Sequence, residues 1–212
     1  MKISITRNVA ATAAFLFLSA VALAGPASAS QSDDAEAFIN GLADKAIEAL
    51  TTSDVGEAER VKRFRQMFRE NFAVEDIGKR VLGRYWRRAS DDEQKQYLQL
   101  FEDYITASYA KQFASYTGEE LVITKTLAEG ETGATVFSEI KLPGGGQKPV
   151  RVDWRLEGSG KQFKIIDLVI EGVSMSTTLN SDFGSIIRNS GGKVSGLLKV
   201  LEEKTASLKN VN

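Results

Sequence analysis

The residue best suited to acid–base chemistry is Asp167, a carboxylate inside the short apolar run from Ile165 to Ile170. A carboxylate in apolar surroundings can act as a general base, and the phenol of Tyr104 or Tyr109 could supply the matching acid. The structural alternative is that Asp167 accepts a backbone N–H or pairs with a neighbouring arginine. We favour the structural role, which leaves an acid–base enzyme as a second hypothesis.

Composition removes most other catalytic chemistry. The 212-residue chain has no His and no Cys, which excludes Ser-His-Asp and Cys-His nucleophile systems and ordinary zinc sites. Neither glycine-rich segment has the pattern of a phosphate-binding loop. Gly144–Gly146 joins two predicted strands, and Gly191–Val194 lacks the hydroxyl residue that must follow the lysine. We therefore predict no catalytic residues, no metal ligands and no cofactor.

The first 29 residues have the pattern of a cleaved export signal. Lys2 and Arg7 precede the uncharged apolar run Val9–Ala24, and Ala27-Ser28-Ala29 supplies small residues for cleavage after Ala29. We therefore predict an exported chain, residues 30–212, that folds as one domain. Removing the two leader cations from 27 basic residues leaves 25 against 28 acidic ones, and this net charge of −3 gives no general attraction to nucleic acid.

The first half of the exported chain has helical periodicity. Apolar residues at helical spacing predict amphipathic helices over residues 33–51, 57–71 and 74–82. Basic residues gather in two clusters, Lys62–Arg69 and Arg84–Arg88, and the second holds two aromatic residues between its arginines. Each cluster is either a solvated face or a docking surface for a partner.

A further helix is predicted from a capping box at Ser90–Glu93 to about Tyr116. With Tyr104 close by, its apolar stripe repeats at steps of four residues: Tyr97, Phe101, Ile105, Tyr109 and Phe113. Such a stripe is either core packed on a sheet or the wall of an apolar cavity, because tyrosine combines an apolar ring with a polar tip. Periodicity alone leaves both interpretations open.

Four strand-like runs follow, separated by glycine-rich turns: 120–127, 134–142, 150–157 and 163–170. Their short links predict an antiparallel meander, and we expect the aromatic helix to cover its buried face. The last run has apolar residues in both alternating sets, so both of its faces need cover.

The predicted fold class is α+β, with one antiparallel four-stranded meander packed against a helical first half and C-terminal helices. We expect the helices over about 33–116, the sheet over about 120–173 and the C-terminal helices over about 180–208, with a break at Gly191-Gly192.

Several short motifs carry a family resemblance. The run Glu171–Met175 is followed by Phe183-Gly184 and Ile187-Arg188, and the earlier run Val81–Arg87 is followed by Glu93-Gln94 and Phe101. With Tyr109 and Tyr116-Thr117-Gly118, these motifs resemble the MlaC or toluene-tolerance family. Its members are periplasmic auxiliary proteins of a phospholipid ABC transport system. The resemblance extends over most of Phe64–Leu201.

The resemblance implies a domain with a deep apolar pocket that takes lipid acyl chains and leaves the headgroup outside. It also implies a periplasmic carrier, which we expect to be monomeric. This carrier would pass phospholipid, as cargo, between an outer-membrane lipoprotein–porin complex and an inner-membrane ABC transporter with its membrane-anchored substrate-binding subunit. Outer-membrane lipid asymmetry would be maintained in this way.

Two pocket positions of the family match Tyr109 and Val173. The complete predicted lipid-binding set adds residues of the aromatic helix and of the apolar strands and their exit: Phe101, Tyr104, Ile105, Phe113, Trp154, Leu168, Ile170 and Met175. A carrier of another amphiphile, such as a hopanoid, is the alternative, because an apolar pocket selects for apolarity more than for a headgroup.

Overall fold

The computed structural model describes residues 26–52, 55–144, 146, 148–158 and 162–210, and residues 1–25 of the predicted signal peptide lie outside this range. The helices are α1 (Pro26–Leu50), α2 (Glu57–Asn71), α3 (Val74–Leu82), α4 (Asp91–Tyr109), α5 (Met175–Asn189) and α6 (Val194–Asn210), with 3-10 helices η1 (Gly83–Arg88) and η2 (Ala110–Ser115). The strands are β1 (Glu120–Glu129), β2 (Gly133–Lys141), β3 (Val150–Glu157), β4 (Lys164–Ile170) and β5 (Val173–Ser174). No helix in the described ranges combines the length and hydropathy that a membrane span requires.

The strands form one antiparallel sheet in the order β1-β2-β3-β4-β5, so each strand pairs with the next along the chain. This confirms the α+β class and the predicted meander. The prediction of four strands is wrong by one, because Val173 and Ser174 turn back to pair with Ile170 and Val169. The turn between β4 and β5 is tight, with left-handed backbone at Glu171 (φ 49°) and at the glycine that follows it (φ 82°).

A β-bulge in β4 changes the expected division of its apolar residues between the two faces. Asp167 pairs with Arg155 of β3 and Ile165 pairs with the next residue, Leu156, so Ile166 has no partner of its own. The extra residue moves Ile165 onto the face that also carries Leu168, and both join one core cluster. Ile165 and Leu168 therefore share one side of the strand, whereas Val169, which is also buried, lies on the other.

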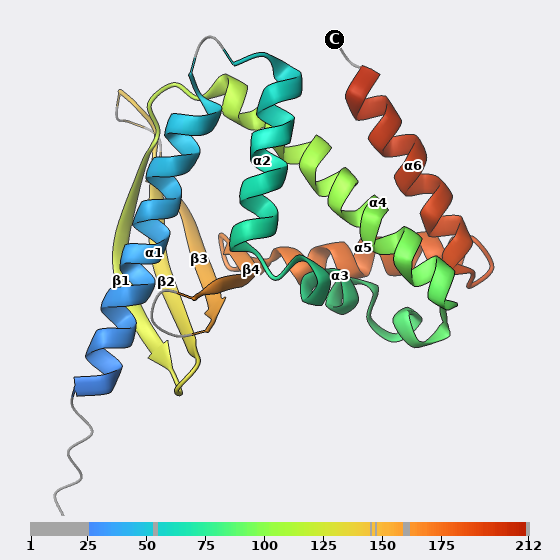
Figure 1. Cartoon of the computed structure of the whole chain (residues 1–212), viewed down its shortest axis with the longest axis horizontal. Coiled ribbons are helices and arrows are strands. Elements are labelled where there is room, and N and C mark those ends of the chain that lie inside the picture. The colour runs from blue at the N-terminus through green and yellow to red at the C-terminus, as the bar shows by residue number, and fades with distance from the viewer. Residues whose placement is uncertain (1–25, 53–54, 145, 147, 159–161, 211–212) are drawn as a thin grey trace, which may run out of the picture.

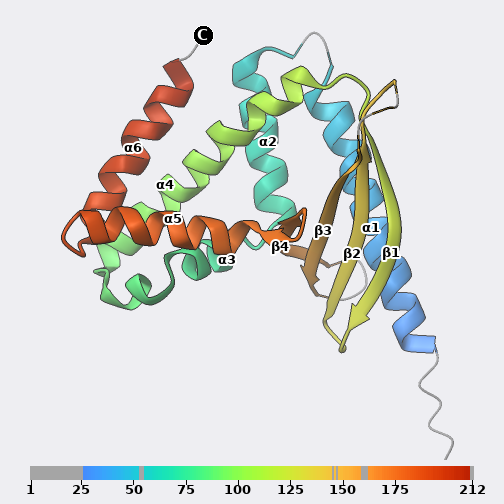
Figure 2. The ribbon, with the colours of Figure 1, turned by 180° about the vertical axis from the view of Figure 1, so that it is seen from behind.

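α1 covers this face of the sheet and lies across β1 and β2 (Figure 1). Its residues Ala35 and Ile39 pack in one core cluster with Ala134, Leu156 and Ile165 of the sheet. Our prediction that the aromatic helix covers the sheet is wrong. α4 lies instead beside α6, and both views of the ribbon show α2 and α4 on the side of α1 away from the outer strand β1 (Figure 2).

The aromatic stripe begins in a helical core rather than on the sheet. The rings of Tyr97 and Phe101 lie 6.4 and 6.5 Å, centroid to centroid, from the ring of Phe183 in α5. α4 ends at Tyr109 and continues as η2, where we predicted one helix to about Tyr116. α5 begins at Met175, earlier than predicted, because the Ser174 hydroxyl before it accepts the Thr177 N–H at 3.1 Å and caps the helix.

α3 crosses α4 at a glycine. The buried Tyr97 hydroxyl donates a 2.9 Å hydrogen bond to the Gly78 carbonyl, and burial raises the pKa of Tyr97. A Cβ at Gly78 would lie 2.9 Å from Leu98 Cδ2 and 3.3 Å from Phe101 Cδ1. Any side chain at position 78 would therefore overlap with atoms of α4.

We expect Gly78→Leu to lower the free energy of unfolding by about 1–3 kcal/mol, because the added side chain overfills the α3–α4 contact. Gly41→Leu in α1 is the matched control, since no atom lies within 4 Å of a Cβ there. In a helix, leucine is favoured over glycine by about 0.8 kcal/mol. Chemical denaturation compares the two variants, and equal stability would contradict the close crossing.

Candidate functional site

A cavity of about 420 Å³ lies between the helices and the sheet. α1 and α2 supply one part of its wall, the end of α4 with η2 a second, and β1 to β4 with the start of α5 a third. Most lining side chains are apolar, and the polar ones are Tyr109, Gln112, Tyr116, Glu119, Asp167 and Ser176. Its size and lining are those of a small-molecule site, for which roughly 300–1,000 Å³ is usual.

The cavity brings together eight of the ten predicted site residues. They are Phe101, Ile105, Tyr109, Phe113, Trp154, Leu168, Ile170 and Met175. The aromatic stripe therefore serves in both of the ways that periodicity left open. Tyr97 fills the helical core, whereas the stripe from Phe101 to Phe113 reaches the cavity wall. Burial raises the pKa of the Tyr109 hydroxyl, as expected for a phenol against an apolar wall.

Two predicted site residues do not line the cavity. Tyr104 packs against the helical core, with its ring 6.2 Å from that of Phe183. Val173 is 57% exposed. The other residue of β5, Ser174, pairs with Val169, and its hydroxyl contacts Asp167 at 2.6 Å. Val173 pairs with Ile170, so both side chains lie on the same face of the sheet. Val173 belongs to the edge strand, however, and lies outside the cavity lining that Ile170 joins.

The first two helices supply lining residues that the sequence prediction missed. They include Leu42, Ile47, Phe64 and Met67, together with Phe72 at the C-cap of α2. Their helical stripes are visible in the sequence, but the predicted lipid-binding set contains no residue of either helix. An apolar stripe that faces a cavity has the same spacing as one that faces core, so nothing in the sequence of either helix separates the two.

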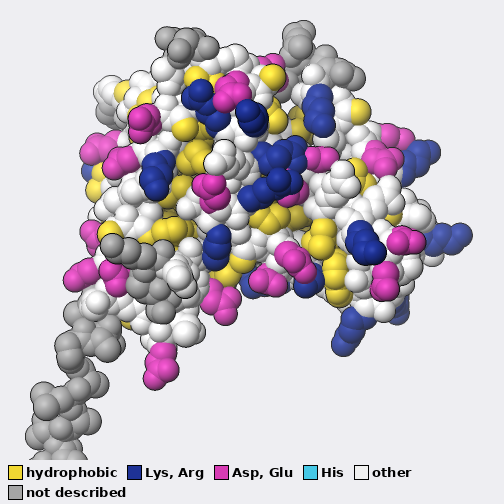
Figure 3. Space-filling view, viewed as in Figure 1, with side chains coloured by type: hydrophobic (Ala, Val, Ile, Leu, Met, Phe, Trp, Pro, Cys, Tyr) yellow, Lys and Arg dark blue, Asp and Glu magenta, His cyan; other side chains and the backbone are white. Residues whose placement is uncertain are grey.

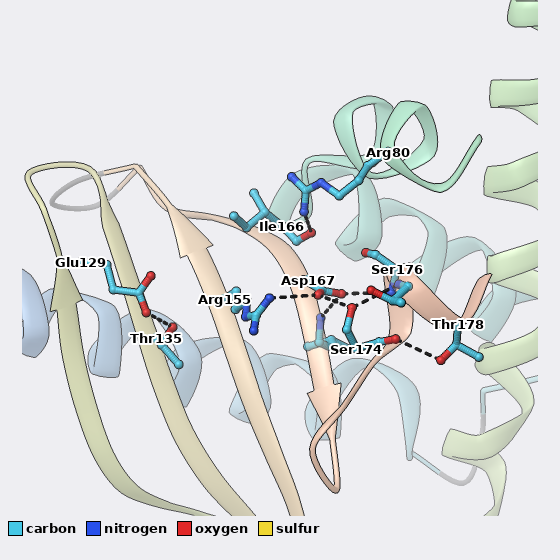
Figure 4. A network of polar contacts seen from close by, with 11 residues as sticks. Arg80, Glu129, Thr135, Arg155, Ile166, Asp167, Ser174, Ser176 and Thr178 are labelled. Carbon is cyan, nitrogen blue, oxygen red and sulfur yellow. Dashed lines mark hydrogen bonds and ion pairs between the residues drawn. The ribbon is translucent and has the colours of Figure 1, made fainter. Parts of the chain in front are cut away.

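Asp167 fixes the junction between β4, β5 and α5 (Figure 4). Its Oδ1 accepts the N–H groups of Leu168 at 3.0 Å and Ser176 at 3.1 Å, and its Oδ2 accepts the Ser174 hydroxyl at 2.6 Å. Arg155 Nη1 lies 3.7 Å from Oδ2. Asp167 is only 5% exposed, so these partners supply the contacts that water would otherwise make. The geometry confirms the structural interpretation of this carboxylate.

One rim of the cavity is polar. Gln112 is an exposed lining residue, and Glu119 is a half-buried one. Glu119 accepts the Thr117 N–H at 2.8 Å, and this backbone hydrogen bond is the main cause that lowers the pKa of its carboxyl group. The Tyr116 hydroxyl donates to the Glu119 carbonyl at 3.1 Å. The cavity thus combines an apolar interior with a rim that stays polar and ionised.

The sequence model of the family described as MlaC protein matches residues 40–203, from within α1 to within α6. The match covers well over half of the chain and reaches every element that lines the cavity. The chain belongs to the MlaC family. This confirms the resemblance drawn from the Gly-Val-Ser-Met step after β4 and from the motif around η1.

Two known proteins share parts of this MlaC domain. The intermembrane phospholipid transport system binding protein MlaC from Haemophilus influenzae is 25% identical over 123 residues, which are 56% of this chain and 56% of that relative. The chain thus matches about half the length of this curated relative. A solved structure of the phospholipid-binding protein from Ralstonia solanacearum in complex with a phospholipid has a TM-score of 0.71 at 24% identity. It covers 84% of this chain and 99% of that chain, and shows that the fold is shared.

In this MlaC family member, the basic cluster of α2 is largely neutralised within the fold. Arg65 pairs with Glu102 at 2.7 Å and with Asp103 at 2.6 Å, and Arg69 pairs with Glu102 at 2.9 Å. Arg63 pairs with an acid of its own helix at 3.0 Å. The space-filling view shows acidic side chains among the basic ones on this face (Figure 3). Most of the charge of the Lys62–Arg69 cluster is therefore paired within the fold.

No group of three or more Asp, Glu, His or Cys side chains in the described ranges is arranged to hold a metal ion.

Proposed function

We propose that this protein is a phospholipid carrier that encloses acyl chains in the cavity between α1, α2, η2 and the sheet. The observation that carries the proposal is the apolar lining of a cavity of about 420 Å³ in an MlaC family domain. The solved Ralstonia protein of the same fold is described as bound to a phospholipid, which supports the assignment. The proposed lipid-contacting residues are the eight predicted ones that line the cavity.

The energetics of lipid transfer require such an enclosure. Each methylene group exposed to water costs about 0.8 kcal/mol, so two sixteen-carbon chains would cost on the order of 25 kcal/mol to cross an aqueous compartment bare. A carrier needs no reaction of its own, because it only replaces water around the chains. Asp167, the carboxylate considered above as a general base, is instead engaged by Ser174, Ser176 and Leu168.

We place this carrier in the periplasm, after removal of residues 1–29 as a signal peptide. It would exchange phospholipid between an outer-membrane lipoprotein–porin complex and an inner-membrane ABC transporter, and so maintain outer-membrane lipid asymmetry. The name of the Haemophilus relative, which refers to intermembrane phospholipid transport, supports this role.

We expect the purified protein to carry phospholipid. Native mass spectrometry should show an added mass equal to one phospholipid, and organic extraction followed by lipid mass spectrometry should identify it. Delipidated protein should take up labelled phospholipid from vesicles. A protein that stays lipid-free in both assays would contradict the proposal, and extraction of a hopanoid in place of phospholipid would assign a different amphiphile to the same cavity.

A further inference from the structure

The end of the molecule at η1 and the last turn of α5 carries four arginines. Arg84, Arg87 and Arg88 belong to η1, and Arg188 belongs to α5. All four side chains are exposed. In a 3-10 helix, side chains three residues apart lie above one another, so Arg84 and Arg87 share a face. These four residues are called the arginine cluster.

The buried ring of Tyr85 holds the cluster together. Arg84 Nη2 donates to the Tyr85 hydroxyl at 3.1 Å, and the guanidinium carbons of Arg84 and Arg88 lie 5.0 and 5.9 Å from the ring centroid. Gly184 of α5 lies against the same ring, and a Cβ there would be 3.8 Å from Tyr85 Cε2 and 3.2 Å from Arg188 Nη1. The Arg84 guanidinium, followed by that of Arg188, lowers the pKa of the Tyr85 hydroxyl.

The charge of this cluster is not neutralised by the fold. Within the described part of the chain, none of the four arginines takes part in an ion pair. Asp91, Asp92 and Glu93 follow η1 closely, but they lie in the first turn of α4, where Glu93 closes the capping box and the helix dipole favours acid. The cluster thus contrasts with Arg65 and Arg69 of α2, whose charges are paired.

We propose that the arginine cluster docks this protein on an anionic phospholipid membrane surface. The planar guanidinium donates in a fork that matches phosphate oxygens, and several arginines near an anionic leaflet attract it additively. The half-buried Trp86 lies within the same 3-10 helix, and tryptophan is the residue type enriched where protein meets lipid headgroups.

A membrane surface fits the cluster better than a protein surface does. Stable protein interfaces have an apolar core surrounded by a polar rim. The large apolar side chains that the described chain exposes, Leu127 and Val173, belong to the sheet rather than to η1 or to the end of α5. The segment between α3 and α4 also lies away from α1 and the sheet (Figure 1), so docking through it leaves that side of the molecule free.

Vesicle sedimentation tests the proposal. We expect the protein to bind vesicles of phosphatidylcholine with phosphatidylglycerol at low salt, and to bind neither pure phosphatidylcholine vesicles nor anionic ones at about 1 M salt, where the Debye length falls to about 3 Å. Each arginine should contribute about fivefold to partitioning. The triple variant Arg84→Gln/Arg88→Gln/Arg188→Gln should therefore bind about a hundredfold more weakly, and the corresponding triple Lys variant should retain most binding.

Two control variants distinguish docking through the arginine cluster from a general effect of net charge and from a loss of folding. The variant Lys199→Gln/Lys204→Gln/Lys209→Gln removes the same charge from exposed positions of α6 and should bind as the unmodified protein does. Arg87→Glu changes an exposed residue that forms no hydrogen bond or ion pair in the described ranges, so it should weaken binding without loss of fold. If the α6 variant loses as much vesicle binding as the triple arginine variant does, the proposal is overturned.

A third control separates docking from lipid uptake. Vesicle binding should persist in a variant whose cavity no longer holds lipid, because the cluster lies outside the cavity lining. Vesicle binding is therefore expected even if the proposed function as a lipid carrier proves wrong. Absence of binding by the unmodified protein to anionic vesicles overturns the docking proposal and leaves the acidic face of a protein partner as the ligand to test next.

Discussion

A glutamate in place of Tyr109 is expected to leave the purified protein without bound lipid. The Tyr109 ring lines the cavity beside Ile105 and Phe113, where acyl chains would exclude water. Lipid can then enter only if the new carboxylate is protonated, and at pH 7 this costs about 4 kcal/mol for a glutamate of ordinary pKa, about 4.3. This corresponds to a loss of lipid affinity of roughly several hundredfold. Native mass spectrometry of the purified variant and uptake of labelled lipid from vesicles measure the loss.

Three comparisons show whether charge in the cavity causes this loss. Tyr109→Phe keeps the ring and should retain lipid. Leu127→Glu places the same charge on β1 at a side chain that is 41% exposed, and should retain lipid too. Lipid uptake by Tyr109→Glu should rise as the pH falls toward 4, because protonation removes the charge. Normal uptake by Tyr109→Glu at pH 7 would show that this part of α4 does not contact the chains.

Local signals predicted most elements of this fold. Glycine-rich turns delimited the strands of the meander, and the capping box at Ser90 placed the start of α4 without error. The bulge at Ile166 could not be read in the same way. A bulge depends on the pairing register with β3. The unpaired residue, Ile166, is an ordinary strand residue, so its type does not signal a bulge. This unpaired residue moves Ile165 to the face of Leu168, a change that strict alternation does not predict.

The candidate site was predicted in part for a similar reason. A periodic apolar stripe reports that a helix face is covered, but not whether protein or ligand covers it. The stripe of α4 was proposed as a wall because it is rich in tyrosine, whereas the stripes of α1 and α2, which contribute Ile47 and Phe64, carried no such sign. Likewise, Arg188 joins Arg84 only through the packing of α5 on η1, which no local pattern reveals.

Val173 shows how a family position can move out of a predicted wall. Its match to the family motif predicts a place in the pocket, yet the tight turn at Glu171 makes β5 a two-residue strand at the edge of the sheet. Val173 shares a face with its partner Ile170, but Ile170 lines the cavity whereas Val173 is 57% exposed. A motif gives the position of a residue in the sequence but not how far from the edge of the sheet it lies.

Asp167→Ala is expected to lower the free energy of unfolding by about 4 kcal/mol. The change leaves the Ser174 hydroxyl and the N–H groups of Leu168 and Ser176 without their acceptor, in a position that is only 5% exposed. Hydrogen bonds to a charged group contribute about 1.5–3 kcal/mol each, and relaxation and water recover part of the sum. For a domain of this size, the melting temperature should fall by about 8–16 °C, which calorimetry measures.

Asp167→Asn separates this structural role from catalysis. Asparagine keeps one oxygen that can accept the two N–H groups, and its amide can donate to the Ser174 hydroxyl, so we expect a loss of about 1–2 kcal/mol. Below their melting temperatures, both variants should still take up lipid, because Asp167 is one polar residue in a cavity lining that is mostly apolar. Equal destabilisation by Ala and Asn would mean that the charge near Arg155, and not the three accepted hydrogen bonds, holds β5 and α5 in place.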